Sequence, residues 1–239
     1  MVRWEDSWSG FHQARNEQEL FTRVEALAQE RGFDSCCDVL RMPWPVSSPA
    51  VAYFDSQPLG WMNHYRENDY LRIDPVVRLG ASSTALMVWS ESLFASAPHL
   101  WTEARGFGLG SAVSQSSWAA HGVFGLLTFA RRAPEPLSES ELEHLRQPLL
   151  VTTHLLHTLM LAFLSPRLAR DVGTALTARE REVLLWTGDG KTAGDIGAIL
   201  SISERTVNFH INNALLKLNA TNKVQAVVKA LALGLIHAG

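Results

Sequence analysis

Two patterns of apolar residues divide roughly the first 165 residues into helices and strands. Apolar positions at helical spacing predict a helix over 18–31, and a second, longer helix after Ser138. Short apolar segments bounded by Gly, Pro and Ser predict strands at 33–42, 50–54, 86–89, 111–117 and 123–131. The last two strands flank a short connection, as in an antiparallel pair. We therefore expect an α/β sandwich, an antiparallel sheet flanked by helices, over residues 1–165.

An aromatic-rich segment, PLGWMNHYRENDYLRIDPVVRLG, occupies residues 58–80. Its pattern predicts a helix, an irregular loop and a second short helix. Asp74-Pro75 marks the start of that second helix, because proline is favoured at the first helical position. A further helix is expected over 99–107.

The long helix begins with a capping box formed by Ser138 and Glu141. Its most apolar stretch, Leu149–Leu164, has 16 residues and includes two His and three Thr. A membrane span needs about 20 predominantly apolar residues, so we interpret this stretch as a buried or interface helix. Residues 166–175 contain Pro and Gly with little apolar periodicity, and we place a linker there.

Residues 176–239 predict four short helices with clear starts and stops. Thr177 with Glu180 and Thr192 with Asp195 form capping boxes at the first two helices. A tight turn at residues 201–203 precedes the third helix, which is expected over 204–218, and the fourth starts near residue 221. This arrangement is a small all-α domain that contains a helix-turn-helix.

The third helix of this domain has an apolar face and a face of unusual polar composition. The apolar face contains Val207, Ile211, Ala214 and Leu218. The other face presents Arg205, Asn208 and Asn212, and no acid occurs between Arg205 and Leu218. Amides pair with adenine and Arg with guanine in the major groove of DNA, which admits one helix. The sequence therefore predicts a DNA-reading helix.

Charge is distributed unevenly along the chain. The net charge of the whole chain is −3, but residues 175–239 carry seven Lys or Arg against five acids. All four lysines lie in this last quarter, which fits a DNA partner. Cys36 and Cys37 are the only cysteines and are adjacent, and the acidic start MVRWEDSW is not a secretory signal. We expect a cytoplasmic protein.

The run from Leu176 to Ile236 resembles the helix-turn-helix domain of LuxR-type transcription regulators. The resemblance covers the Glu180, Leu184 and Gly190 positions and the GKT and TVNFH segments. It implies that Asn208 and Asn212 face the bases of DNA. It also implies contacts with the DNA backbone by Lys191, Thr192, Arg205, Thr206 and His210.

The spacing W-x3-Y-x8-D-P, followed by Trp89 and Gly125, resembles the autoinducer-binding domain of quorum-sensing LuxR members. These proteins respond to N-acyl-homoserine lactones. The resemblance implies that Trp61 donates to the lactone carbonyl, Asp74 accepts from the amide N–H, and Tyr65 and Thr128 donate to the amide carbonyl. It further places Trp89 on the lactone ring, and Leu126 and Trp101 around the acyl tail. We expect no cofactor besides this signal ligand.

Two positions depart from the commonest family pattern. Gln57 stands where many members have Tyr, and Val76 stands where several have Thr or Ser. They leave the length and 3-oxo substitution of the acyl tail open. They also keep an alternative open, namely a regulator of the same fold that binds DNA without a lactone or senses another small molecule. From the residues alone, the simpler interpretation of Trp61, Tyr65 and Asp74 is core aromatics with a capping carboxylate, and it is the resemblance that favours a ligand site.

An enzyme is the main rival class. The segment from Gly188 to Thr192 resembles a phosphate-binding loop, but Leu185 stands where that motif needs Gly. No G-x-S-x-G elbow is present, and we interpret His154 and His157 as core or interface residues instead of metal ligands. We expect a homodimeric, lactone-responsive transcription regulator that binds double-stranded DNA. This hypothesis fails if Trp61, Tyr65 and Asp74 satisfy one another around a solid interior without a cavity.

Overall fold

The computed structural model describes residues 3–58, 60–119, 122–168 and 175–237. The chain forms two compact units. The first consists of Met1–Met42, Val51–Ala119 and Val123–Phe163, and the second consists mainly of the residues from Leu164 onward but also includes Pro43–Ala50. We call them the N-terminal unit and the C-terminal unit.

A five-stranded antiparallel sheet with the order β2-β1-β5-β4-β3 forms the centre of the N-terminal unit. Its strands are β1 (Ser35–Arg41), β2 (Val51–Asp55), β3 (Met87–Val88), β4 (Ser111–Trp118) and β5 (Phe124–Arg131). The central strands β1, β4 and β5 are buried along almost their whole length. This burial fits a sheet that is covered on both faces, and the predicted α/β sandwich is confirmed.

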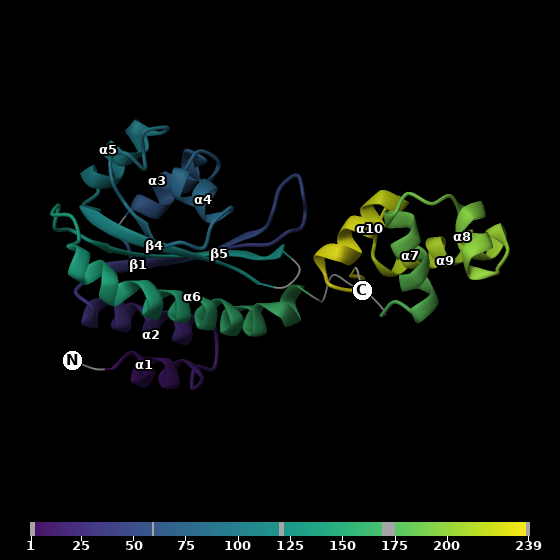
Figure 1. The fold of residues 1–239 in the computed structure, drawn as a ribbon, viewed down its shortest axis with the longest axis horizontal. Helices are drawn as coiled ribbons and strands as arrows, with labels where there is room; N and C mark the ends of the chain where they lie inside the picture. Colours follow the sequence, from purple (N-terminus) through teal and green to yellow (C-terminus); the bar gives the residue numbers. More distant parts are fainter. Residues whose placement is uncertain (1–2, 59, 120–121, 169–174, 238–239) are drawn as a thin grey trace. The chain divides into compact units, whose positions relative to one another are not determined.

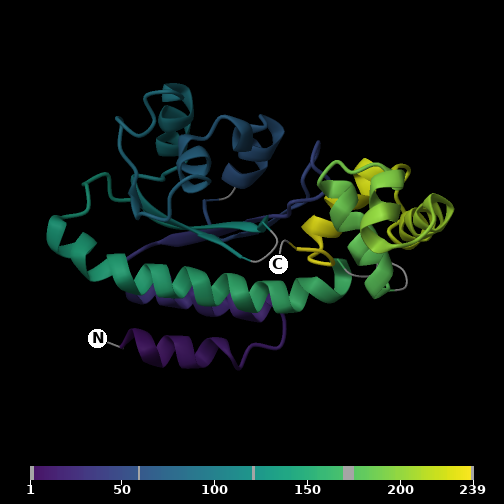
Figure 2. The ribbon, with the colours of Figure 1, turned by 45° about the vertical axis from the view of Figure 1, so that its right-hand side comes forward.

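Helices cover both faces of the sheet (Figures 1 and 2). One face carries α3 (Trp61–Glu67), α4 (Pro75–Gly80) and α5 (Pro98–Gly106), with a short 3-10 helix, η1 (Tyr70–Arg72), between α3 and α4. The other face carries α2 (Glu17–Glu30) and α6 (Glu139–Leu168), and α1 (Trp4–Phe11) lies outside this layer. The short helices thus face the side of the sheet opposite to α6.

The first helix, α1, is absent from the sequence prediction. Its aromatic residues Trp4, Trp8 and Phe11 recur at helical spacing, but acidic and polar residues separate them. Phe11 is buried, and Trp8 Nε1 donates a hydrogen bond to Thr152 Oγ1 on α6 at 2.9 Å. The helix therefore depends on contacts with distant parts of the chain.

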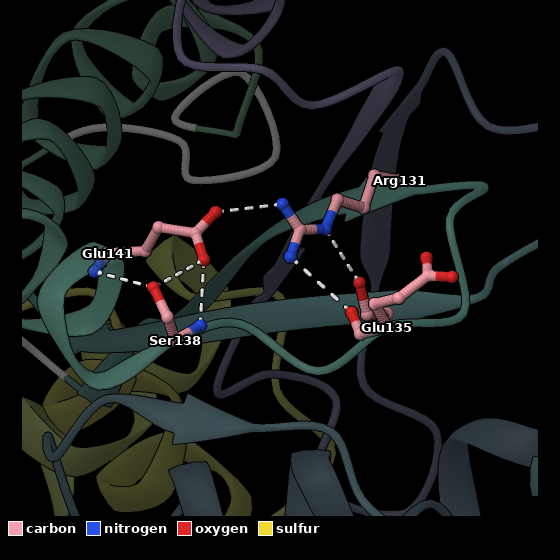
Figure 3. Close-up of polar contacts among 5 residues, drawn as sticks. Arg131, Glu135, Ser138 and Glu141 are labelled. Carbon is pink, nitrogen blue, oxygen red and sulfur yellow. Dashed lines mark hydrogen bonds and ion pairs between the residues drawn. The ribbon is translucent and has the colours of Figure 1, made fainter.

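The start of α6 is fixed by the capping box and by Arg131 (Figure 3). The Glu141 carboxylate accepts hydrogen bonds from the Ser138 backbone N–H at 2.7 Å and from its hydroxyl at 2.8 Å. Arg131 Nη1 donates to the same carboxylate at 2.9 Å. These bonds, led by the backbone one, lower the pKa of Glu141 to about 2. The predicted helix start is thereby confirmed.

The far end of α6 reaches Leu168, so the first three residues of the predicted linker are helical. Residues 169–174 of that linker lie outside the described residues. By length and composition alone, Glu139–Leu164 is apolar enough to cross a membrane, and 33% of its most apolar window is buried. In both ribbon views α6 lies along the sheet of the N-terminal unit (Figures 1 and 2). This position fits the predicted buried or interface helix.

The C-terminal unit contains the four expected helices, α7 (Ala178–Gly188), α8 (Ala193–Leu200), α9 (Glu204–Lys217) and α10 (Lys223–Ala232). Capping boxes at Thr177 and Thr192 start the first two. The turn between α8 and α9 is tight: a Cβ on Gly197 would lie 2.8 Å from the Ile202 carbonyl oxygen. Because only glycine fits this approach, Gly197 allows the helix-turn-helix to close.

Candidate functional site: a buried cavity and a polar helix face

A small cavity lies in the N-terminal unit between the sheet and α3 and α4, with a volume of about 30 Å³. The residues that line it are Cys37, Val39, Gln57, Trp61, Met62, Tyr65, Asp74, Val76, Val77, Trp89, Leu126 and Thr128. All the predicted ligand residues except Trp101 are therefore brought together. Trp101 instead stacks on Phe94, with ring centroids 5.2 Å apart.

Local structure explains why these side chains converge. Trp61 and Tyr65 are four residues apart on α3, so they point to the same side of the helix, and both are buried. Asp74 is the N-cap of α4, and its Oδ1 accepts a hydrogen bond from the Val76 backbone N–H at 2.8 Å. Thr128 of β5 faces Cys37 of β1 in the sheet register. The cavity therefore has polar groups from helix and sheet.

Tyr65 and Asp74 satisfy each other in this structure. Tyr65 donates its hydroxyl proton to Asp74 Oδ2 at 2.8 Å, and only 5% of Asp74 is exposed. Burial raises the pKa of Asp74 to about 6 and also raises the pKa of Tyr65. Trp61 Nε1, by contrast, has no hydrogen-bond partner among the described residues. Tyr65 and Asp74 thus satisfy each other, but they do so beside a cavity and not around a solid interior.

A chain of hydrogen bonds connects Trp89 with Thr128 through Ser114. Trp89 Nε1 donates to Ser114 Oγ at 2.9 Å, and Ser114 Oγ lies 2.7 Å from Thr128 Oγ1. An indole N–H only donates, so Ser114 accepts from Trp89. Either hydroxyl can donate between Ser114 and Thr128, and where Ser114 donates, the Thr128 proton is left for the cavity. Ser114 is not among the residues that the sequence predicts for this site. The available signal was the group of serines in the predicted strand over 111–117.

The cavity is small compared with an acyl-homoserine lactone. A volume of about 30 Å³ holds one or two water molecules, whereas pockets for small molecules measure roughly 300–1,000 Å³. Binding a ligand of that size requires the surrounding side chains or helices to move apart. Gln57, Met62 and Val76, from one loop and two short helices, are among the residues that line the cavity.

In the C-terminal unit, α9 presents the polar face that the sequence predicts. Arg205, Asn208 and Asn212 are exposed, and His210 and Thr206 are partly buried. Val207 and Ala214 are buried on the opposite side of the helix. The three exposed side chains are therefore available to a partner outside this unit.

Two hydroxyls with a predicted DNA contact already have intramolecular partners. Thr192 Oγ1 lies 2.7 Å from Asp195 Oδ2 in the capping box of α8. Thr206 Oγ1 lies 2.7 Å from Ser203 Oγ at the start of α9. Lys191, next to Thr192, is exposed. Among the residues at these two helix starts that are predicted to contact the DNA backbone, Lys191 therefore has an accessible positive charge.

The chain belongs to the LuxR family of bacterial transcription regulators. Residues 16–159 match the autoinducer binding domain, and residues 174–230 match the domain of bacterial regulatory proteins of the luxR family. The chain is thus an autoinducer-binding regulator with a helix-turn-helix DNA-binding domain, as the resemblance predicts.

Individual relatives are similar over almost their full length. The transcriptional activator protein SolR of Ralstonia nicotianae is 56% identical over 233 residues, which cover 98% of each chain. The regulatory protein SdiA of Escherichia coli is 35% identical over 95% of this chain and 93% of its own. These relatives are transcription regulators, which confirms the prediction of a regulator instead of an enzyme.

Solved structures of SdiA share the fold. Escherichia coli SdiA superposes with a TM-score of 0.82 at 32% identity, covering 98% of both chains. SdiA in complex with octanoyl-rac-glycerol gives a TM-score of 0.83 at 30% identity, covering 99% of this chain and 96% of that one. The fold is therefore shared across both parts of the chain.

Proposed function

We propose that this regulator binds an N-acyl-homoserine lactone in the cavity between the sheet and α3 and α4. The observation that carries the proposal is the convergence of Trp61, Tyr65, Asp74 and Thr128 on one buried cavity. An acyl-homoserine lactone is neutral and has two carbonyl acceptors and one amide donor. Burying these groups without partners would cost about 1–3 kcal/mol each, so a receptor needs a matching set.

The available partners match those groups one by one. Trp61 Nε1, which has no hydrogen-bond partner among the described residues, would donate to the lactone carbonyl. Asp74 would accept from the amide N–H, and this step redirects the Tyr65 hydroxyl from Asp74 Oδ2 to the amide carbonyl. Thr128, held by Ser114, would donate to the same carbonyl. Ligand binding thus exchanges an internal hydrogen bond for ligand contacts.

For the C-terminal unit, the proposal assigns DNA reading to α9. Asn208 and Asn212 would face bases, and Arg205 and Lys191 would contact the DNA backbone. The exposure of all four side chains supports these roles. His210, Thr192 and Thr206 would make additional contacts with the DNA backbone, although both threonine hydroxyls also have intramolecular partners.

A homodimer in the cytoplasm completes the proposal. Two recognition helices would meet a near-palindromic site whose spacing the dimer sets. Apolar side chains exposed on two helices support self-association: Val151 on α6, and Val224 and Leu231 on α10. Val224 is 67% exposed, which leaves its apolar surface for a partner.

The decisive experiment is a melting-temperature titration of the whole protein with N-acyl-homoserine lactones of four to twelve acyl carbons. A ligand that binds the folded state at 100 times its Kd stabilises it by about 2.7 kcal/mol, so at least one lactone raises the melting temperature of the N-terminal unit. Asp74→Asn is expected to remove that response. Asp69→Asn is the matched control, because Asp69 is exposed and does not line the cavity.

Octanoyl-glycerol serves as a second probe, since it is bound to SdiA in a solved structure. Stabilisation by octanoyl-glycerol but by no lactone would favour the alternative of a regulator that senses another acyl compound. DNA binding that is equal with and without every probe would favour a ligand-independent regulator.

A further inference from the structure

Phe209 is an aromatic residue on α9 that faces away from the core of the C-terminal unit. Its side chain is 60% exposed, whereas Val207, Ala214 and Leu218 on the other side of the helix are fully buried. At about 3.6 residues per turn, Phe209 lies almost directly opposite that buried stripe. Its ring contact among the described residues is with the neighbouring His210, at 5.6 Å between centroids.

The neighbours of Phe209 on the exposed face are polar. Arg205 precedes it by four residues, Asn212 follows it by three, and Asn208 is adjacent. Leu216, seven residues further along the same face, is also exposed, at 80%. Exposed apolar residues that are scattered over a surface are common and need no function. The position of Phe209 is informative instead, because it lies in the middle of the face proposed to read DNA. It also lies in the N-terminal half of α9, the half that contacts base edges in helix-turn-helix proteins.

We propose that Phe209 determines sequence specificity by packing on the C5-methyl group of a thymine in each half-site. A phenyl ring neither donates nor accepts a conventional hydrogen bond, so it gains little from the polar edges of the bases. The thymine methyl is the apolar group that the major groove presents, and Phe is among the side chains that contact it. The inference rests on the proposed function of α9 as the DNA-reading helix.

The test begins with selection of binding sites from a random duplex library, using the full-length protein with N-octanoyl-homoserine lactone. Each thymidine of the selected half-site is then replaced singly by deoxyuridine, which removes only the methyl group. We expect one position per half-site at which this replacement weakens DNA binding about fourfold. This factor corresponds to about 0.8 kcal/mol, the free energy of burying one methyl group. Phe209→Ala should weaken binding to the thymidine site and abolish the response to deoxyuridine at that position.

The control variant is Leu185→Ala, which truncates an exposed apolar side chain on α7 and should retain the deoxyuridine response. Circular dichroism of Phe209→Ala checks that the unit is folded, as expected for a ring outside the core. The proposal would be overturned if the selected half-sites contained no thymine. It would also be overturned if replacing each thymidine by deoxyuridine left the affinity for DNA unchanged at every position. So would an undiminished deoxyuridine response in Phe209→Ala.

Failure of the wider proposal is distinguishable. If Arg205→Ala and Asn208→Ala also leave affinity and selected sequence unchanged, α9 does not read DNA at all. If they change DNA binding while the deoxyuridine response is absent, only the role of Phe209 fails. If Phe209→Ala weakens self-association, measured by sedimentation, and leaves the deoxyuridine response intact, the ring serves a protein contact and the proposal is wrong.

Discussion

Replacing Gly125 with alanine is expected to disrupt a buried polar network on the α6 side of the sheet. The alanine methyl group would overlap with the ring of His157, because that ring packs directly against Gly125. The His157 ring bonds through Nε2 to Asp38 Oδ1 at 2.6 Å and through Nδ1 to the Ser117 hydroxyl. Asp38 and His157 are 0% and 2% exposed, so water cannot replace these bonds.

The size of the effect follows from what the displaced ring leaves behind. Asp38 Oδ2 already has no hydrogen-bond partner among the described residues, and losing His157 would leave Oδ1 without one as well. A buried polar group that loses its hydrogen-bond partner costs about 1–3 kcal/mol, and more where the group is charged. A domain is stable by roughly 5–15 kcal/mol in total, so Gly125→Ala should remove a large share of the stability of the N-terminal unit.

Equilibrium unfolding in urea, followed by tryptophan fluorescence, measures this loss. Every tryptophan except Trp186 precedes Leu164 in the sequence, so the signal reports mainly on the part of the chain that carries Gly125. Gly106→Ala is the matched control, because a Cβ at Gly106 meets no atom within 4 Å. Its stability should stay within about 0.5 kcal/mol of the original protein.

A double-mutant cycle tests the cause. If overlap with His157 is the reason, Gly125→Ala should cost less than about 1 kcal/mol in a His157→Ala background. Equal costs of Gly125→Ala with and without His157 would refute the reasoning. In that case the lost stability would come from the strand backbone and not from the Asp38–His157 pair.

The remaining predictions concern the carboxyl groups of Asp74 and Glu180, and Lys191, which is proposed to contact DNA. Burial raises the pKa of Asp74 from 3.8 to about 6, so folding favours its protonated form. The free energy of unfolding should fall by about 2 kcal/mol as pH rises from 4 to 7, and this contribution should vanish in Asp74→Asn. Glu180→Gln should destabilise the C-terminal unit by about 1–3 kcal/mol, seen as faster hydrogen exchange in α7, since Glu180 Oε2 accepts from Thr177 N and Lys217 Nζ, each at 2.8 Å. Lys191→Ala should lower the slope of log affinity for DNA against log salt concentration by about 1, and an unchanged slope would remove Lys191 from the interface.

The fold was largely predictable because its signals are local. The short apolar segments of β1 and β5, the capping boxes at Ser138 and Thr177, and the proline after Asp74 are each recognised within a few residues. The cavity lining followed from family spacing and not from physical reasoning alone. Local patterns and a resemblance together therefore recovered the architecture and most of the candidate site.

Contacts between distant residues explain what the sequence did not reveal. Asp38 and His157 are 119 residues apart, and nothing near either one indicates the other. Ser114 acquires its role only because the sheet register places it opposite Thr128. The Tyr65–Asp74 hydrogen bond depends on the loop between α3 and α4 bringing the two side chains together. Each of these pairs exists only after the chain has folded.

The strand register explains how one sheet supports both the cavity and the Asp38–His157 pair. Successive residues of a strand point to opposite faces, so Cys37 and Val39 line the cavity while Asp38 between them bonds to His157. On β5, Leu126 lines the cavity and the preceding Gly125 leaves room for the His157 ring. A slip of one residue would bury a carboxylate in the cavity and place apolar side chains against His157. The buried pair therefore opposes misregistration of the strands that line the cavity.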